Sequence, residues 1–307
     1  MGRGRPDQQP PPAAADRPVT AADDLAARLR DGAPANIALM HLLMAAESPG
    51  AAAAALADAA ERHPGLTAPV AEVDVLFRAH PDAWRTVHAV AGGVDHAPAL
   101  GGAEATLDHW RASFDRLAET APEAGVALYA LGDPALLAAA TAEVVDALDA
   151  WGLLGPDRDA LDLGCGMGRF SEAMAPRLRS VLGVDLSAGM VAEARRRSRH
   201  ANVRYAAGTG RDLAGVPDGS ADLVLAADVF PYLVEAGLAW AHVAEMARVL
   251  RPGGAAVLLN YSYRGDPARD RADLAGAAAA HGFALERVGE RPFRLWDATV
   301  FVLRRPA

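Results

Sequence analysis

Three glycines at alternate positions form the part of the sequence best suited to chemistry. They follow a short apolar run and precede an expected helix, in the stretch ALDLGCGMGRF at residues 160–170. Glycine lets the backbone turn sharply and approach a ligand closely, and the free N–H groups at a helix start face that ligand. Asp185 ends the next expected strand, 17 residues after Gly168, where a carboxylate can accept hydrogen bonds from both hydroxyls of a ribose. The spacing therefore predicts a site for a nucleoside-containing ligand.

The glycine spacing distinguishes two kinds of cofactor site. Nicotinamide-binding enzymes prefer G-x-G-x-x-G, because a pyrophosphate needs the helix N-terminus kept clear. Here Gly164, Gly166 and Gly168 give G-x-G-x-G, preceded by Asp162 and Leu163. At these residues the chain resembles the class I S-adenosylmethionine-dependent methyltransferases, whose first motif is an acidic residue, an apolar residue and G-x-G-x-G.

The resemblance covers about residues 134–307 and rests on five features in order. Besides the glycine loop, these are the segment after the second strand, the entry to the fourth, the approach to the fifth and a terminal hairpin. The three internal segments are Val184-Asp185-Leu186-Ser187 with Met190, Asp218-Gly219-Ser220-Ala221-Asp222, and Arg248-Val249-Leu250-Arg251-Pro252-Gly253-Gly254. Together, at the expected spacing, they indicate the family. The alternative is a glycine turn that binds no ligand, but such a turn has no need of Asp185.

The resemblance implies a set of contacts to S-adenosylmethionine, whose product is S-adenosylhomocysteine. The three glycines, with Cys165 between them as a structural residue, would shape the loop around the methionine moiety. Asp162 would organise the loop and help to receive the ammonium group. Asp185 would hold the ribose and Leu186 would pack on adenine, with Met190 among the cofactor contacts.

One departure from the family concerns the adenine. Many relatives have Gly-Asp after the third strand, with the Asp side chain near adenine N6. Here the sequence is Gly208-Thr209-Gly210-Arg211-Asp212, so Thr209 takes that place and Asp212 is the possible substitute. The expected contacts on this side of the cofactor are Thr209, Gly210, Arg211 and Asp212.

Two loops are expected to face the methyl group, because ligands of an open parallel sheet sit at the carboxyl ends of its strands. One loop follows the fourth strand at residues 227–233, and the other follows the fifth at 260–264. Asp228 is a general base, a cofactor contact or a loop cap. Aromatic rings in these loops either line an acceptor pocket, where they favour a nearby sulfonium, or pack at the rim of the sheet. The rings are Phe230, Tyr232, Tyr261 and Tyr263.

Tyr129 lies in helical sequence ahead of the glycine loop. N-terminal helical segments of such enzymes often cover the cofactor, so Tyr129 is the expected lid residue, the alternative being a packed tyrosine at a helix end. The candidate catalytic residues are therefore Asp228, Tyr232 and Tyr129. The 9 histidines show no H-x₃₋₅-H spacing, so no metal site is expected.

The elements that must position these residues follow from hydrophobic periodicity and turn residues. Residues 1–18 are Pro-rich and are expected to form a disordered tail, 19–133 a helical region and 134–307 the methyltransferase domain. Thr20 or Asp23 would cap a helix to Arg30, Asn36 would cap the next, and Ser48-Pro49-Gly50 would form a turn. The next helix is expected to end near His63. Later helices are expected to cover about 68–91, 103–121, 134–151, 169–178, 187–199 and 238–250. Strands are expected at 160–163, 181–184, 202–206, 222–227, 255–260, 283–290 and 297–305.

Alternating strands and helices predict a parallel sheet with helices on both faces. The last two strands have no helix between them, so they pair as an antiparallel hairpin. The expected fold is α/β: a seven-stranded, mostly parallel, doubly wound sheet with a C-terminal antiparallel hairpin, preceded by an α-helical N-terminal region. That region would form a lid, part of the acceptor pocket or a homodimer interface.

Composition excludes several classes of function. The 307 residues carry a net charge of −9, which argues against a nucleic-acid binder. All 30 basic residues are Arg, so Schiff-base chemistry on a Lys amine is excluded. No apolar run suits a membrane span and the start lacks a signal peptide, while the single cysteine fits a reducing cytoplasm.

These observations favour methyl transfer from S-adenosylmethionine to a small-molecule acceptor, by in-line displacement at the sulfonium methyl. Two alternatives stay open: a methyltransferase acting on RNA or protein, and a catalytically silent cofactor-binding partner protein. The acceptor atom (O, N, S or C) and the general base also stay open, as does the oligomeric state.

Overall fold

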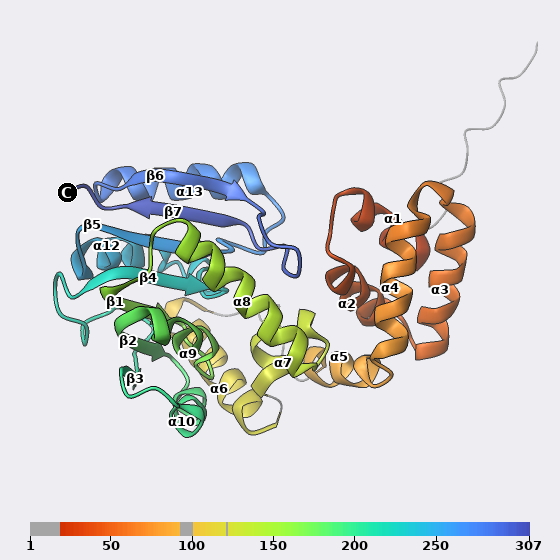
Figure 1. The fold of residues 1–307 in the computed structure, drawn as a ribbon, viewed down its shortest axis with the longest axis horizontal. Coiled ribbons are helices and arrows are strands. Elements are labelled where there is room, and N and C mark those ends of the chain that lie inside the picture. The colour runs from red at the N-terminus through yellow and green to blue at the C-terminus, as the bar shows by residue number, and fades with distance from the viewer. Residues whose placement is uncertain (1–18, 93–100, 121) are drawn as a thin grey trace, which may run out of the picture.

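The computed structural model describes residues 19–92, 101–120 and 122–307. Helices α1 to α5 form a group to the right in Figure 1, and α6 and α7 lie beside an α/β part built on one sheet. The elements ahead of the α/β part are α1 (Ala21–Arg30), α2 (Ala35–Ala45), α3 (Pro49–Arg62), η1 (Pro64–Leu66), α4 (Thr67–Ala79), α5 (Ala83–Ala91), α6 (Ala103–Thr120), α7 (Pro122–Val126) and η2 (Leu128–Ala130), where η marks a 3₁₀ segment.

The sheet has seven strands in the order β3-β2-β1-β4-β5-β7-β6. Strands β1 to β5 are parallel, and β7 pairs antiparallel with both β5 and β6. The strands are β1 (Gly155–Leu163), β2 (Leu178–Asp185), β3 (Val203–Ala207), β4 (Ala221–Ala227), β5 (Leu250–Leu259), β6 (Ala284–Glu290) and β7 (Val300–Arg304). The expected doubly wound sheet and its antiparallel hairpin are confirmed.

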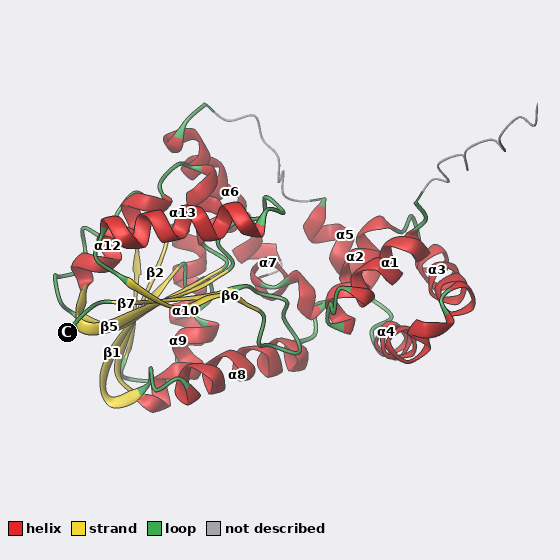
Figure 2. Cartoon of the chain, turned by 90° about the horizontal axis from the view of Figure 1, so that it is seen from above, coloured by secondary structure: helices red, strands yellow, loops and turns green. Residues whose placement is uncertain are grey.

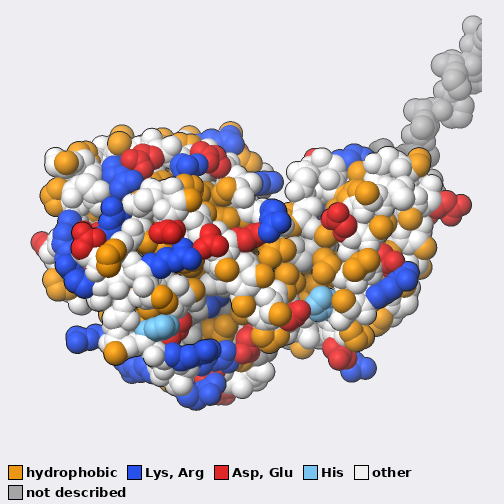
Figure 3. Space-filling model, in the orientation of Figure 1, with side chains coloured by type: hydrophobic (Ala, Val, Ile, Leu, Met, Phe, Trp, Pro, Cys, Tyr) orange, Lys and Arg blue, Asp and Glu red, His pale blue; other side chains and the backbone are white. Residues whose placement is uncertain are grey.

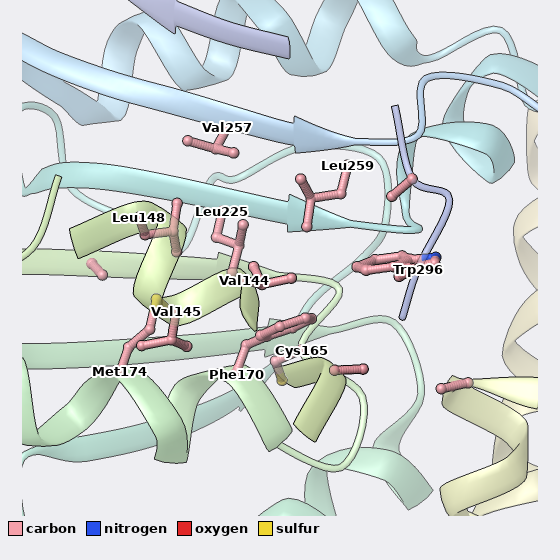
Figure 4. Close-up of a cluster of buried hydrophobic side chains, with 14 of the residues drawn as sticks. Val144, Val145, Leu148, Cys165, Phe170, Met174, Leu225, Val257, Leu259 and Trp296 are labelled. Atoms are coloured by element: carbon pink, nitrogen blue, oxygen red, sulfur yellow. The ribbon is translucent and has the colours of Figure 1, made fainter. Parts of the chain in front are cut away.

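Helices cover both faces of the sheet, because successive strand residues point to opposite sides. Leu225 packs with α8 and α9, whereas Val224 packs with α12 and α13. Figure 2 shows these helix pairs on opposite sides of the strands, and Figure 4 shows the side chains of the first layer. The helical elements of this part are α8 (Pro134–Ala150), α9 (Arg169–Met174), η3 (Ala175–Arg177), α10 (Ala188–Arg197), α11 (Phe230–Glu235), α12 (Ala239–Val249) and α13 (Pro267–Ala280).

Helix α1 begins with two reciprocal hydrogen bonds. The Thr20 hydroxyl accepts a hydrogen bond from Asp23 N at 3.2 Å, and the Asp23 carboxylate accepts one from Thr20 N at 3.3 Å. This capping box satisfies backbone donors that would otherwise lack partners. It confirms the helix predicted from Thr20 to Arg30.

Other helix boundaries differ from the prediction. Pro34, and not Asn36, precedes α2, and the range 68–91 contains two helices because the chain leaves the helix after Ala79. Ser48 caps α3, so the predicted turn is a helix start. Helix α13 was missed, since its Ala-rich sequence carries few large apolar residues to reveal a period.

Asn36 joins the helical region to the α/β part. It lies in the first turn of α2 and is 1% exposed. Its Nδ2 group donates to the carbonyl oxygen of Tyr129 at 3.0 Å and to that of Leu295 at 2.8 Å. Because Leu295 lies in the loop before β7, this single amide connects three segments distant in sequence.

None of the helices in the described ranges is both long and apolar enough to cross a membrane.

Replacing Asn36 by Ala should lower the free energy of unfolding by about 1–3 kcal/mol, because buried carbonyl groups lose their donor. Amide hydrogen exchange in α2 should also rise. Asn202→Ala is the matched control, since Asn202 donates to two carbonyls within the α/β part, those of Ala175 and Leu178. Denaturant unfolding and hydrogen exchange measure both effects. Equal exchange of α2 in the two variants would contradict the joining role of Asn36.

Candidate functional site

A cavity of about 720 Å³ opens at the carboxyl ends of the parallel strands. Gly164 and Gly166 line it after β1, Asp185 after β2, Asp228 after β4 and Asn260 after β5. Side chains of α2, α5 and α6 line it from the opposite side. The cavity therefore lies where the topology of an open α/β sheet places ligands.

Two glycines of the loop, Gly164 and Gly168, have no room for a side chain. Gly164, Gly166 and Gly168 have φ values of 69°, 52° and 86°, in the left-handed region. A Cβ atom on Gly164 would lie 2.7 Å from Val229 Cγ2, and one on Gly168 would lie 2.8 Å from Tyr205 Cζ. Gly168 itself is buried against Tyr205 and does not line the cavity. The first two glycines thus form the cavity wall, and the third lets the loop pack.

Asp185 holds the glycine loop and also faces the cavity. Its Oδ2 accepts a hydrogen bond from Gly166 N and its Oδ1 accepts one from Ser187 N, both at 2.8 Å. Burial raises the pKa of this carboxyl group, and the backbone donors oppose the rise. Each oxygen retains a lone pair for a further donor. Together with the wall formed by Gly164 and Gly166, this carboxylate fits the ribose of S-adenosylmethionine. Leu186 and Met190 line the adjoining wall.

Asp162 does not line the cavity. It is 1% exposed and accepts a hydrogen bond from the Ser171 hydroxyl at 2.6 Å, and burial raises its pKa to about 6. It fastens the end of β1 to α9, while its contact with the ammonium group stays a prediction. Cys165 also points away from the cavity, into the core layer of Figure 4, where burial raises the pKa of its thiol.

The predicted adenine-side residues after β3 lie outside the cavity. Thr209, Arg211 and Asp212 are exposed, and the Asp212 carboxylate accepts a hydrogen bond from the Thr209 hydroxyl at 3.2 Å. Arg211 forms an ion pair with Glu104. These polar side chains thus satisfy one another at the surface. Gly210 packs against Leu186, since a Cβ atom there would lie 2.9 Å from Leu186 Cδ1.

Asp228 and Asn260 form a linked pair at the ends of β4 and β5. Both have left-handed backbones, with φ values of 57° and 64°. Asn260 Nδ2 donates to Asp228 Oδ1 at 2.7 Å, and the Tyr263 hydroxyl donates to the same oxygen at 2.8 Å. Burial raises the pKa of Asp228, and these two donors oppose the rise. Sequence reasoning did not identify Asn260 as a site residue, although Asn after a strand is a signal for such a turn.

Two of the four predicted acceptor-pocket rings line the cavity. Tyr232 and Tyr263 do, and Tyr232 lies 4.4 Å from Trp110 between ring centroids. Phe230 and Tyr261 are buried in the core and do not line it, so that prediction is wrong for them. They face the α12 and α13 side of the sheet, where apolar packing removes both rings from water.

Tyr129 lies buried in the cavity wall, and its role as a lid residue stays a prediction. Its ring stacks on Trp296 at 5.3 Å, and its hydroxyl accepts a hydrogen bond from Arg169 at 3.0 Å. Burial raises the pKa of the phenol. The hydroxyl is therefore neutral and held in place, which suits a positioning role better than that of a base.

Helix α6 is fastened across the open edge of the site. Asp115 Oδ1 accepts hydrogen bonds from the Ser187 hydroxyl at 2.6 Å and from Gly189 N at 2.9 Å. Trp110 Nε1 donates to Glu235 at 3.1 Å. Asp115 thus binds the start of α10, where a negative charge suits the helix dipole. Its role was missed because a single Asp within a helix gives no sequence signal.

Residues 161–258 match the family described as methyltransferase domain. A probable S-adenosylmethionine-dependent methyltransferase of Mycolicibacterium smegmatis is 36% identical over 97 residues, which are 32% of this chain and 35% of that protein. The matched stretch thus spans about a third of the relative's length.

Two solved structures align with part of this chain at low sequence identity. The magnesium protoporphyrin IX methyltransferase of Synechocystis with bound S-adenosylmethionine is 21% identical, with a TM-score of 0.49 over 68% of this chain and 100% of that chain. A chain from a Haloferax volcanii complex between a methyltransferase activator and a methyltransferase is 18% identical, with a TM-score of 0.49 over 63% and 98% of the two chains.

Asp162→Asn should remove a pH dependence of folding. The usual pKa of the carboxyl group is 3.8, and its raised value in the native state is about 6. At pH values between the two, Asp162 is protonated in the native state and ionised in the unfolded state. The free energy of unfolding of the wild type therefore falls as pH rises through this window. Asn keeps the acceptor for Ser171 without the charge, so the variant should be more stable at neutral pH by about 1–3 kcal/mol. Denaturant unfolding at several pH values measures this effect.

The exposed residue Asp157 supplies the control for this measurement. Asp157→Asn should leave the pH dependence of unfolding as it is in the wild type. If the free energy of unfolding of Asp162→Asn changed with pH between 3.8 and about 6 as it does in the wild type, the Asp162 carboxyl group would not be the source of the pH dependence.

Asp185→Ala should weaken S-adenosylhomocysteine binding by about 1.5–3 kcal/mol, the value of lost hydrogen bonds to a charged group. Isothermal calorimetry measures the affinity, and Asp185→Asn, which keeps one acceptor, should fall between the wild type and the Ala variant. Asp212→Ala is the control, because this exposed carboxylate lies outside the cavity. Unchanged affinity of Asp185→Ala would remove Asp185 from the ribose site.

Proposed function

We propose that this chain, whose α/β part is a class I S-adenosylmethionine-dependent methyltransferase domain, methylates a small-molecule acceptor. The observation that carries the proposal is one shared cavity. Gly164, Gly166 and Asp185 line one part of it, and Asp228 and Tyr232 line another. A cofactor held by the first group would present its methyl group toward the second.

The cofactor supplies an activated sulfonium methyl group, so the protein's task is alignment and the exclusion of water. The glycine loop and Asp185 hold the donor. Tyr129 and Trp296 cover the cavity from the side of the loop before β7. Asp228, fixed by Asn260 and Tyr263, is the candidate group for removing a proton from the acceptor.

The helical region supports a small acceptor because it supplies one wall of the cavity. Ile37 and Met40 of α2, Val90 of α5 and Phe114 of α6 all line it. The volume of about 720 Å³ lies within the range of pockets for small ligands. This arrangement favours a role in enclosing the acceptor over a role in homodimer formation.

Surface charge gives further support for the small-molecule acceptor. On the face shown in Figure 3, Arg and acidic side chains are interspersed over the α/β part. RNA binding commonly uses a continuous basic surface, and the net charge of the chain is −9. An RNA or protein acceptor and a catalytically silent partner protein are the competing functions that an experiment must distinguish.

Incubation with methyl-labelled S-adenosylmethionine and a cell extract distinguishes the three functions. We expect label in the small-molecule fraction and none in RNA or protein. Asp228→Asn should reduce this labelling by about 10²-fold, as for loss of a general base, while calorimetric affinity for S-adenosylhomocysteine changes little. Label in RNA or protein would support the macromolecular alternative. Tight cofactor binding without any labelling would support the silent partner protein.

A further inference from the structure

The carboxylates of Asp228 and Asp297 give the cavity an unbalanced negative charge. Both line it, and the charge of Asp297 contributes to the raised pKa of Asp228. Within residues 19–92, 101–120 and 122–307, neither forms an ion pair with Arg or His. Arg169 is the nearby guanidinium. Its charge lowers the pKa of Asp228, although its hydrogen bond goes to the Tyr129 hydroxyl and it lies 4.1 Å from the centroid of the Phe170 ring. His41 also lines the cavity and is neutral at physiological pH, because burial lowers its pKa.

Asp185 is a third carboxylate of the cavity, and its hydrogen bonds come from backbone N–H groups and not from a cation. Asp270 forms an ion pair with Arg264, and Asp266 caps α13. Arg271 and Arg291 are exposed at the surface. With the one charge of Arg169 set against Asp185, Asp228 and Asp297, two negative charges stay uncompensated.

Aromatic rings surround the same part of the cavity. The Tyr232 ring centroid lies 4.4 Å from that of Trp110, 5.5 Å from that of Phe114 and 6.4 Å from that of Tyr263. All four residues line the cavity, and the Tyr263 hydroxyl donates to Asp228. Aromatic faces attract cations, and most strongly where water is excluded. Trp110 is buried and Tyr232 half-buried, whereas Tyr263 is 63% exposed and lies on the solvent side of the site.

The opposite wall is mostly apolar. Ile37, Met40, Val90, Leu117 and Leu128 line it, from helices ahead of the α/β part and the segment η2, and His41 and Ser113 are its polar members. Such a surface binds hydrocarbon by removing it from water and offers few partners for a polar body. The cavity thus has an anionic, aromatic part and a hydrophobic part.

We propose that the acceptor is a hydrophobic amine, bound with its nitrogen between Asp228, Asp297 and the aromatic rings and its apolar body along α2. This inference rests on the proposed methyl transfer. The sulfonium of the donor carries one positive charge, since the donor's ammonium and carboxylate cancel. The two uncompensated negative charges therefore leave one for a protonated acceptor. An anionic acceptor such as a carboxylate would be repelled by the same two groups.

The amine must lose a proton before it can react. The Asp228 carboxylate takes the proton from the ammonium, which frees the nitrogen lone pair. The nitrogen–carbon bond to the methyl group then forms as the carbon–sulfur bond breaks, and its electron pair stays on sulfur. The methylated nitrogen now carries the positive charge, and the donor leaves as neutral thioether.

Paired amines and alcohols test the charge of the acceptor directly. We would measure binding of octylamine against octanol, and of benzylamine against benzyl alcohol, by calorimetry on the full chain saturated with S-adenosylhomocysteine. In at least one pair the amine should bind about tenfold more tightly than the alcohol of the same shape. Asp297→Asn should reduce that preference about tenfold while leaving affinity for S-adenosylhomocysteine within about twofold.

Glu290→Gln is the matched control, because it removes one negative charge at an exposed site that pairs with Arg287 and does not line the cavity. It should leave the preference for amines unchanged. Equal binding of amine and alcohol, no binding of either amine at millimolar concentration, or a preference insensitive to Asp297→Asn would each overturn the proposal. If the wild type did not bind S-adenosylhomocysteine at all, the proposed methyl transfer itself would be refuted.

Discussion

The hydrogen bond from Asn260 to Asp228 connects the two central strands where they end, and the shape of the site depends on it. Both residues have left-handed backbones, which Asn and Asp accept more readily than most residues. Asn260 also pairs with Thr299, whose N donates to Asn260 Oδ1 at 3.0 Å and whose carbonyl oxygen accepts from Asn260 N at 2.8 Å. The pair thus aligns β4, β5 and the start of β7, and aims the Asp228 carboxylate into the cavity.

The loop before β7 connects this end of the sheet to the helical region. Trp296 stacks on Tyr129, and Asn36 holds the backbones of Tyr129 and Leu295. Arg169, at the start of α9, donates to the Tyr129 hydroxyl. A helix far from the sheet in sequence is therefore positioned by the same loop that connects the two strands of the antiparallel hairpin. This explains how α2 becomes a wall of the cavity without a long interface of its own.

Sequence was sufficient where local chemistry determines the structure. The glycine loop could be predicted because a Cβ atom at Gly164 has no room, and Asp185 because it follows a strand at a fixed distance from that loop. Asn36 was assigned to a helix cap because that is the common role of its type. Its real partners, two backbone carbonyl groups, lie 93 and 259 residues away in sequence. Phe230 and Tyr261 were assigned to the pocket by their loops, but the face on which a ring lies depends on packing that one sequence does not reveal.

The carboxylates at the site share one electrostatic property. Burial raises the pKa of Asp162, Asp185 and Asp228, so each ionised group is less stable here than in water. Hydrogen bonds from Ser171, Asn260 and the backbone reduce this penalty without cancelling the charge. A cationic ligand in the cavity would lower the pKa of Asp185 and Asp228, and linkage converts such a change into affinity. On the proposal made above, a chain without Lys would gain selectivity for positive charge by leaving carboxylates of the cavity uncompensated until a ligand binds.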